Sequence, residues 1–247
     1  MEAAKNNVVE IDHLYKSFGT NDVLKDFSMH IGTGESVAVL GKSGSGKSVL
    51  IKCMVGLLAP DKGSIRVFNN DVQTLSHDAM DALRARIGFL FQSNALYDSM
   101  TVRDNLVFPL RHWKEKNVDE EHAVDQALED VGLLHTKGMM PMELSGGMRK
   151  RIALARTLIL RPEIILYDEP TTGLDPVTAR EISQLIVQVQ KKYNAASLII
   201  SHDMNCIRIT ANRIVMLIDG TCYANDTAAQ LMKSADPRIH EFFFEAT

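Results

Sequence analysis

The chain has 247 residues, of which 45% are hydrophobic and 23% charged, and its formal net charge at pH 7 is −4. These proportions are typical of a globular protein with a full core, built as one α/β domain or as one domain with an insertion. The acidic balance excludes a broad electrostatic footprint for nucleic acid, and the one basic run, Arg149–Arg151, is expected to be a solvated helix face.

The cysteines and the apolar runs indicate the redox compartment of the protein and its relation to a membrane. Three cysteines with no CxxC pair favour a reducing compartment and unpaired thiols, and they suggest no zinc site. Residues 1–7 lack the apolar core of a signal peptide, and no run reaches the ~18 apolar residues of a membrane span. We therefore expect that any work at a membrane is done through a partner.

Apolar and polar residues alternate in the first part of the chain, which predicts two strands, over Val8–Leu14 and Phe27–Ile31, joined by a turn at Gly19–Asp22. Two aromatic residues, Tyr15 and Phe18, stand at that turn. Each could belong to the core or could stack on a purine ring.

The next segment, Gly41–Ser48, has the G-x-x-x-x-G-K-S pattern of a phosphate-binding loop. An apolar run, Val37–Leu40, precedes it and a helix-forming run, Val49–Met54, follows it, which is the strand, loop and helix setting that this loop requires. Its backbone N–H groups can surround a phosphate at the positive end of the helix. Lys47 would reach the β- and γ-phosphates, and Ser48 would ligand Mg²⁺. The residues assigned to phosphate binding are Gly41, Lys42, Ser43, Gly44, Ser45, Gly46, Lys47 and Ser48.

Beyond the loop, the helix is apolar almost all round and is expected to continue to Leu58, buried between layers. Short strands are predicted at residues 65–68 and 87–91, with an exposed short helix between them. From about Ser93 to Leu160 the pattern changes to helices and loops, including an amphipathic helix at Asp119–Val131. Since no low-complexity linker flanks this stretch, it predicts a helical insertion packed on the parent domain.

Alternation of strands and helices returns after residue 160. The predicted strands are 164–167, 197–200 and 213–218. Helices are expected after Asp175, after Asp203 and after Asp236, where an acidic or proline residue favours a helix start. The last of these helices carries an exposed-looking aromatic run, Phe242–Phe244.

The strand at 164–167 ends in two carboxylates, Asp168 and Glu169. Asp168 would hold Mg²⁺ through water, and Glu169 could orient or deprotonate the water that attacks the γ-phosphate. Strand ends commonly carry carboxylates, so this interpretation depends on the phosphate-binding loop elsewhere in the chain.

A Ser-Gly-Gly sequence, Ser145–Gly147, precedes a helix predicted at Arg149–Leu160. A hydroxyl and free backbone N–H groups at a helix start can form a second anion-binding site. A serine in this position can equally be an ordinary helix cap.

Six motifs occur in the order and spacing of ATP-binding cassette (ABC) ATPases, and the resemblance covers essentially the whole chain. They are Gly41–Ser48, Gln92, Leu144–Met148, Ile164–Glu169, Gly173–Asp175 and His202. The resemblance implies an α/β, P-loop NTPase fold with a RecA-like core, an antiparallel β subdomain and an inserted α-helical subdomain. Within a single domain of residues 1–247, it places the core and its β subdomain at 8–92 and 161–247, and the helical subdomain with the signature motif at 93–160.

The resemblance assigns roles around one bound ATP. Phe18 is similar to the aromatic residue that stacks on adenine, with Tyr15 as the alternative. Gln92 is similar to the glutamine that senses Mg²⁺ and the γ-phosphate, and His202 to the histidine that contacts the γ-phosphate. The implied catalytic residues are Glu169, His202 and Lys47, and the implied Mg²⁺ ligands are Ser48, Gln92 and Asp168.

The remaining roles involve a second copy of the chain. Ser145, Gly146 and Gly147 are similar to the signature residues that contact the γ-phosphate of ATP in the other subunit, and Asp175 to a residue that crosses the dimer interface. Two copies would pack head-to-tail, with each ATP between the Lys47 site of one copy and the Ser145 site of the other. ATP hydrolysis to ADP and phosphate would then open and close this dimer.

Three details resemble the ATPases of MCE-type phospholipid transporters, the maintenance-of-lipid-asymmetry (Mla) group. Met148 replaces the usual signature glutamine, the region Phe91–Arg111 is similar to their glutamine loop, and the tail Asp236–Ile239 runs into aromatic residues. The group implies a peripheral subunit at the cytoplasmic face of the inner membrane, with no direct contact to lipid or nucleic acid. A groove near Gln92–Val102 would receive a short helix of a transmembrane permease, and MCE-domain and small accessory subunits would complete the complex.

Other interpretations stay open. Thr171–Asp175 is shared with amino-acid importer ATPases, so the cargo could be an amino acid or a lipoprotein. A soluble ABC ATPase of iron–sulfur assembly is a second alternative. A nucleic-acid-handling ABC protein is a third, which the single cassette and the acidic charge disfavour. Copurification of a membrane permease would separate transport from the last two classes.

Overall fold

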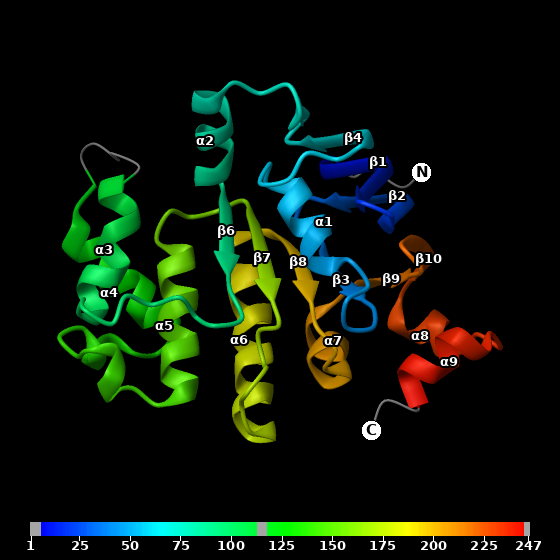
Figure 1. Ribbon diagram of the computed structural model, residues 1–247. Helices are drawn as coiled ribbons and strands as arrows, with labels where there is room; N and C mark the ends of the chain where they lie inside the picture. The colour runs from blue at the N-terminus through cyan, green and yellow to red at the C-terminus, as the bar shows by residue number, and fades with distance from the viewer. Residues whose placement is uncertain (1–5, 113–117, 245–247) are drawn as a thin grey trace.

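The computed structural model describes residues 6–112 and 118–244. Residues 1–5, which belong to the segment without a predicted signal peptide, lie outside the described residues. Two sheets form the core, with helices on both faces of the larger one (Figure 1). None of the helices in the described part of the chain combines the length and the apolar character needed to cross a membrane.

The N-terminal sheet is antiparallel, with the strand order β2-β1-β4-β5. Its strands are β1 (Asn7–Phe18), β2 (Asn21–Gly32), β4 (Lys62–Val67) and β5 (Asn70–Asp71). The predicted hairpin is confirmed, but both strands are longer than expected. Irregular register between Ile11 and Leu14, where His13 has a positive φ of 49°, interrupts the two-residue alternation, so the pattern ended before the strand did.

The larger sheet has the order β10-β9-β3-β8-β7-β6. Its strands are β3 (Ser36–Leu40), β6 (Ile87–Leu90), β7 (Ile164–Asp168), β8 (Ala196–Ile200), β9 (Arg213–Ile218) and β10 (Thr221–Asp226). All neighbours pair in parallel except β10, which runs antiparallel to β9. The sequence analysis missed β10, because this edge strand has no fully buried residue to mark it.

Successive residues of the parallel strands pack against opposite faces of this sheet. In β3, Val37 and Val39 pack with α1 (Lys47–Met54) and the N-terminal sheet. Ala38 and Leu40 pack on the other face with α7 (Met204–Thr210) and the last helix. Two short helices near the C-terminus, α8 (Ala228–Leu231) and α9 (Pro237–Phe244), both contribute side chains to this face. Burial on both faces explains the continuous apolar runs of these strands.

A second hydrophobic cluster joins the predicted helical region to β6, β7 and β8. Its helices are α3 (Val102–His112), α4 (Glu120–Asp130), α5 (Gly146–Leu158) and α6 (Pro176–Tyr193), while α2 (His77–Ala85) and the short 3₁₀ turns Leu134–Thr136 and Pro141–Glu143 lie in the connections. In Figure 1, α3, α4 and α5 gather on the left of the sheet, opposite α8 and α9. The proposed subdomain boundaries near residues 92 and 160 stay a prediction.

The helix after the phosphate-binding loop is shorter than predicted. It ends at Met54, not at Leu58, because Gly56 adopts the left-handed conformation with φ 68°. Gly56 N–H then donates to Cys53 O at 3.1 Å and Leu57 N–H to Lys52 O at 2.8 Å, the paired bonds of a Schellman motif. Gly56 therefore terminates the helix.

Two expectations about exposure were also wrong. Lys150, predicted on a solvated face, is only 2% exposed, because its α5 position faces the loop after β6 and its Nζ donates to Gln92 O at 2.9 Å. In the aromatic run of α9, Phe243 is buried with Ile239 against β3 and β9. All three cysteines are free thiols, as predicted.

Candidate functional site

A cavity of about 670 Å³ lies at the carboxyl ends of β3, β7 and β8 and gathers most of the predicted site residues. Its volume lies within the ~300–1,000 Å³ range of small-molecule and cofactor sites. The predicted residues that line it are Phe18, Gly41, Ser43, Gly44, Gly46, Lys47, Ser48, Gln92, Asp168, Glu169 and His202. These residues come from five separate parts of the sequence. Adjacent parallel strands bring four of the parts to one edge of the larger sheet, and the end of β1 in the N-terminal sheet adds Phe18.

The phosphate-binding loop wraps the first turn of α1. Gly46, immediately before the helix, has φ 105°, and a Cβ there would lie 2.8 Å from Val23 Cγ1, so only glycine fits. Lys47 Nζ donates to two carbonyls of the loop, Gly41 O at 2.7 Å and Lys42 O at 2.9 Å. Burial lowers the pKa of Lys47, and the nearby carboxylates of Asp168 and Glu169 oppose that shift. The ammonium group is therefore held inside the loop, where a phosphate can take over its contacts.

Asp168 is the last residue of β7 and borders the same cavity. Burial raises the pKa of this carboxyl, the neighbouring Glu169 raises it further, and Lys47 and Lys150 act in the opposite direction. A carboxylate whose negative charge is poorly solvated is suited to hold a cation.

Glu169 has a strained backbone, with φ 50° in the left-handed region. Its N–H donates to Ile200 O at 2.8 Å, which fixes it to the end of β8. Its carboxylate Oε2 lies 2.9 Å from His202 Nδ1 and accepts from Thr172 Oγ1 at 3.2 Å. Because these contacts fall on Oε2, Oε1 is the oxygen that we expect to accept a proton from water.

The two aromatic candidates are separated by the fold. Phe18 lines the cavity, whereas Tyr15 pairs with Lys62 on the neighbouring strand and is not among the lining residues. Asp61 fixes the segment before Phe18, accepting from Ser17 N at 2.6 Å, from Ser17 Oγ at 2.8 Å and from Lys16 Nζ at 2.8 Å. The hydrogen bonds from Lys16 and Ser17 lower the pKa of Asp61 to about 2. No role at the site was predicted for Asp61.

Replacing Asp61 with alanine should raise the KM for ATP roughly threefold to tenfold, because the segment that presents Phe18 loses three hydrogen bonds to an ionised group. The kcat should change little, since no phosphate-binding residue is touched. The depressed pKa means that the native contacts persist above the ordinary carboxyl pKa and weaken only as pH falls toward about 2. The ratio of the two KM values should therefore be constant from pH 6 to 8.

Steady-state ATPase kinetics on both proteins measure this. Asp12→Ala is the matched control. It removes an exposed carboxylate from β1, the strand that ends at Phe18, and should leave the KM unchanged. An unchanged KM in Asp61→Ala would mean that the segment before Phe18 does not depend on this carboxylate.

The signature residues lie in a different cavity, of about 460 Å³, that shares no lining residue with the first. Ser145, Gly146, Gly147 and Asp175 all line it. Ser145 caps α5 by accepting from Met148 N at 3.2 Å, and Asp175 caps α6 by accepting from Val177 N at 3.0 Å. The two groups of predicted residues therefore line separate cavities of one copy, and we call these two cavities half-sites.

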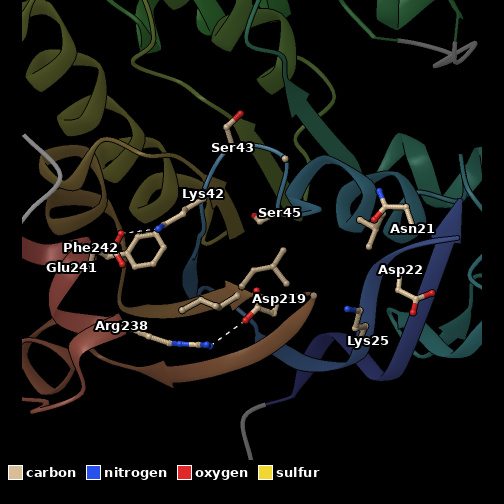
Figure 2. Close-up of a pocket in the computed structure, with 15 residues that line it drawn as sticks. Asn21, Asp22, Lys25, Lys42, Ser43, Ser45, Asp219, Arg238, Glu241 and Phe242 are labelled. Atoms are coloured by element: carbon tan, nitrogen blue, oxygen red, sulfur yellow. Dashed lines mark hydrogen bonds and ion pairs between the residues drawn. The ribbon is translucent and has the colours of Figure 1, made fainter.

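Lys42 and Ser45 of the loop line a third cavity, on the side of the loop that faces α9 (Figure 2). Lys42 Nζ pairs with Glu241 Oε1 at 2.6 Å, and Arg238 of the same helix pairs with Asp219 at 3.1 Å. Ser43 and Gly44 line both this cavity and the first one, so the two cavities adjoin along the loop. Both ion pairs are solvent-exposed, so each contributes little to stability.

The donor set at the first cavity fits a magnesium ion that keeps water and phosphate ligands. Within residues 6–112 and 118–244, no three His, Cys, Asp or Glu side chains gather closely enough to hold a metal alone. Ser48, Gln92 and Asp168 instead offer a hydroxyl, an amide and a carboxylate at one cavity. Oxygen ligands of this kind, in small number, match the way Mg²⁺ binds with nucleotide phosphates.

Sequence reasoning missed side chains that place the predicted ones. Lys150 holds the backbone of Gln92, and Ser201 Oγ lies 3.5 Å from Glu169 Oε2. Each is a single polar residue far along the chain from its partner. Lys150 differs from its charged neighbours Arg149 and Arg151 in α5 only in being buried, and burial of one lysine cannot be predicted from a local pattern.

Comparison with known proteins gives a consistent result. The family described as ABC transporter matches residues 24–172. A probable ribonucleotide transport ATP-binding protein, mkl, of Mycobacterium leprae is 40% identical over 95% of this chain and 68% of its own length. The intermembrane phospholipid transport system ATP-binding protein MlaF of Haemophilus influenzae is 35% identical over 96% of this chain and 90% of its own length. The methionine import ATP-binding protein MetN of Clostridium tetani is 38% identical over 86% of this chain and 67% of its own length.

Solved structures resemble the fold closely. The cbiO1 protein of Clostridium perfringens, part of an ABC transporter complex, aligns with a TM-score of 0.84 and 28% identity over 92% of this chain and 90% of its own. The dimeric ATP-binding cassette MJ0796 bound to ADP and Pi aligns with a TM-score of 0.79 and 30% identity over 89% of this chain and 98% of its own. The chain therefore has the fold of an ATP-binding cassette.

Proposed function

Because this chain belongs to the ABC transporter family, as the subunit that binds ATP and hydrolyses it to power transport, we propose that the cargo of its transporter is phospholipid, carried between membranes. The observation that carries the proposal is the extent of the match to MlaF, which covers 96% of this chain and 90% of that protein. The matches to mkl and MetN leave about a third of those proteins uncovered. The MetN match makes amino-acid import the alternative cargo class.

The hydrolytic chemistry follows from the first cavity. Lys47 and the loop N–H groups would bind the phosphates, and Glu169 would accept a proton from the attacking water while His202 contacts the γ-phosphate. Ser48, Gln92 and Asp168 would hold Mg²⁺, which when bound neutralises charge on the β- and γ-phosphates. Phe18 would stack on the adenine ring.

Closure of the site would require a second copy of the chain. Lys47 and Ser145 line cavities with no common residue, so one copy cannot contact a single phosphate from both. A head-to-tail dimer would place Ser145, Gly146, Gly147 and Asp175 of one copy over the ATP of the other. The dimeric form of MJ0796 supports this arrangement.

The surface after Gln92 would contact the permease. Tyr97 and Phe108 are both exposed, and their ring centroids lie 5.0 Å apart. Aromatic residues are enriched at protein interfaces, so this exposed pair supports a docking surface here. We infer a peripheral position at the cytoplasmic face of the inner membrane, held by a transmembrane permease, with MCE-domain and small accessory subunits as further partners.

The test is to purify the intact membrane complex through a tag on this chain and to identify bound molecules by mass spectrometry. We expect a permease and enriched phospholipid, and ATP-dependent phospholipid transfer after reconstitution into vesicles. Phe108→Ala should reduce the amount of permease recovered, and Val177→Ala, another exposed apolar side chain, should not. Bound methionine or another amino acid would contradict the phospholipid cargo, and recovery without any permease would contradict the transport role.

A further inference from the structure

Two loops at the ends of neighbouring strands serve different half-sites. The loop after β8, Ser201–Asp203, carries His202 to the cavity that contains Lys47. The loop after β7 continues beyond Glu169 to Gly173–Asp175, which line the cavity that contains Ser145. Because β7 and β8 pair in parallel, the two loops lie side by side. A bond from the loop after β8 to the part of the β7 loop beyond Glu169 therefore connects the two half-sites of one copy.

Glu169 touches Ser201 and His202, and further along the same loop a part-buried side-chain hydrogen bond from Thr171 also joins it to the loop after β8. Thr171 is 5% exposed, and its Oγ1 donates to Asp203 Oδ2 at 2.9 Å. The other oxygen of the same carboxylate, Oδ1, accepts from Asn205 N at 2.9 Å and from Cys206 N at 3.2 Å, which caps α7. Asp203 N–H donates to Ser201 Oγ at 3.0 Å. Asp203 is therefore held firmly by the residues around His202, and Thr171 is held by Asp203.

The loop after β7 is fixed at its far end as well. Asp175 accepts from Val177 N, Thr178 N and Thr178 Oγ1 and so belongs to the first turn of α6. Thr171 and Asp175 are the two anchors of a short segment, one tied to the switch-histidine loop and the other to α6. These contacts tie the position of the loop that carries His202 to the position of this segment at the Ser145 half-site.

We propose that Thr171 and Asp203 are positioning residues that couple His202, at the ATP of their own copy, to Gly173–Asp175, at the ATP of the partner copy. The inference rests on the proposed head-to-tail dimer. In that dimer the bond joins the two ATP sites through each chain, so loss of the γ-phosphate at one site alters the geometry of the other.

The hydroxyl of Thr171, rather than its volume, carries the coupling. Thr171→Val keeps the side-chain shape but removes the donor to Asp203 Oδ2, and leaving this part-buried acceptor without its donor costs free energy. The setting is apolar enough that burial raises the pKa of the adjacent Cys206 thiol. Thr171→Ser restores a donor and should restore the coupling. Thr210→Val is the matched control, because it removes a buried hydroxyl of α7 that bonds only within that helix, to Cys206 O at 2.7 Å.

The first experiment measures ATPase kinetics of the intact complex. Thr171→Val should lower kcat roughly tenfold with the KM for ATP within about twofold of wild type, a split that separates positioning from loss of binding. Thr171→Ser should recover most of the activity, and Thr210→Val should match wild type. The proposal is wrong if Thr171→Val behaves like Thr210→Val, or if Thr171→Ser is as slow as Thr171→Val while thermal unfolding shows all three folded.

The second experiment uses complexes with two differently tagged copies, one of them carrying Glu169→Gln so that hydrolysis occurs at the other copy's site. Adding Thr171→Val to the Glu169→Gln copy should reduce that remaining hydrolysis severalfold, because the change acts across the interface. Adding Thr210→Val there should not. An equal rate for these two complexes would overturn the coupling. Adding Ser145→Ala to the same copy tests the head-to-tail dimer itself, and failure of that variant to slow hydrolysis would instead contradict the proposed dimer.

Discussion

Replacing Glu169 with glutamine is expected to lower kcat for ATP hydrolysis about a thousandfold, the size of a general-base contribution. Glutamine keeps the shape and can still contact Thr172 and His202, so the loop should keep its position. ATP affinity should be retained, because no phosphate-binding group is removed. Steady-state ATPase assays and equilibrium binding of labelled ATP measure the two quantities separately.

The same variant should accumulate as an ATP-bound dimer, since hydrolysis is the step that loosens it. Size-exclusion chromatography in ATP and Mg²⁺ would detect the dimer, and adding Ser145→Ala should abolish it by removing the half-site that the partner supplies. Glu163→Gln makes the same chemical change at the other end of β7, where Glu163 forms an exposed pair with Arg86, and should behave as wild type. Undiminished turnover in Glu169→Gln would remove Glu169 from the base role.

Replacing Lys47 with alanine should weaken ATP binding about a hundredfold, because charge-assisted hydrogen bonds to phosphate are among the strongest in proteins. Lys47 is also a structural part of the loop, donating to Gly41 O and Lys42 O, so the empty loop is expected to lose order as well. Isothermal titration with ATP and Mg²⁺ gives the affinity, and the ATPase rate should fall in parallel.

Lys52→Ala is the control for that variant. Lys52 lies in the last turn of α1 with an exposed side chain and is separated from the loop by more than one helical turn. Its replacement removes the same charge from the same helix, so affinity should stay near the wild-type value. Equal affinities in Lys47→Ala and Lys52→Ala would contradict the assignment of the phosphate-binding loop.

The parts of the site that the sequence predicted well are built from neighbours in the chain. The loop Gly41–Ser48 depends on its own glycines and on the strand and helix that flank it. The caps of α5 and α6 involve a side chain and N–H groups two or three residues later. Contacts between residues a few positions apart can be predicted from the residue types in a short motif.

Errors arose where a residue's environment is set by distant parts of the chain. Lys150 has charged neighbours in the sequence and was predicted to be solvated, but the loop that carries Gln92 packs over it. For Tyr15 and Phe18, the family resemblance rather than their positions in one strand favoured Phe18, and the fold places Phe18 but not Tyr15 in the lining of the Lys47 cavity.

By itself, then, the sequence determined the phosphate-binding loop, the acidic end of β7, the helix caps and the family resemblance, since each resides in a contiguous motif or in the order of motifs. Tertiary structure alone decided that Asp61 supports Phe18, that Lys150 holds Gln92, and that Thr171 bonds to Asp203. The reason is that each of these pairs joins residues separated by more than thirty positions, and only the packing of strands and helices brings their polar atoms within hydrogen-bonding distance.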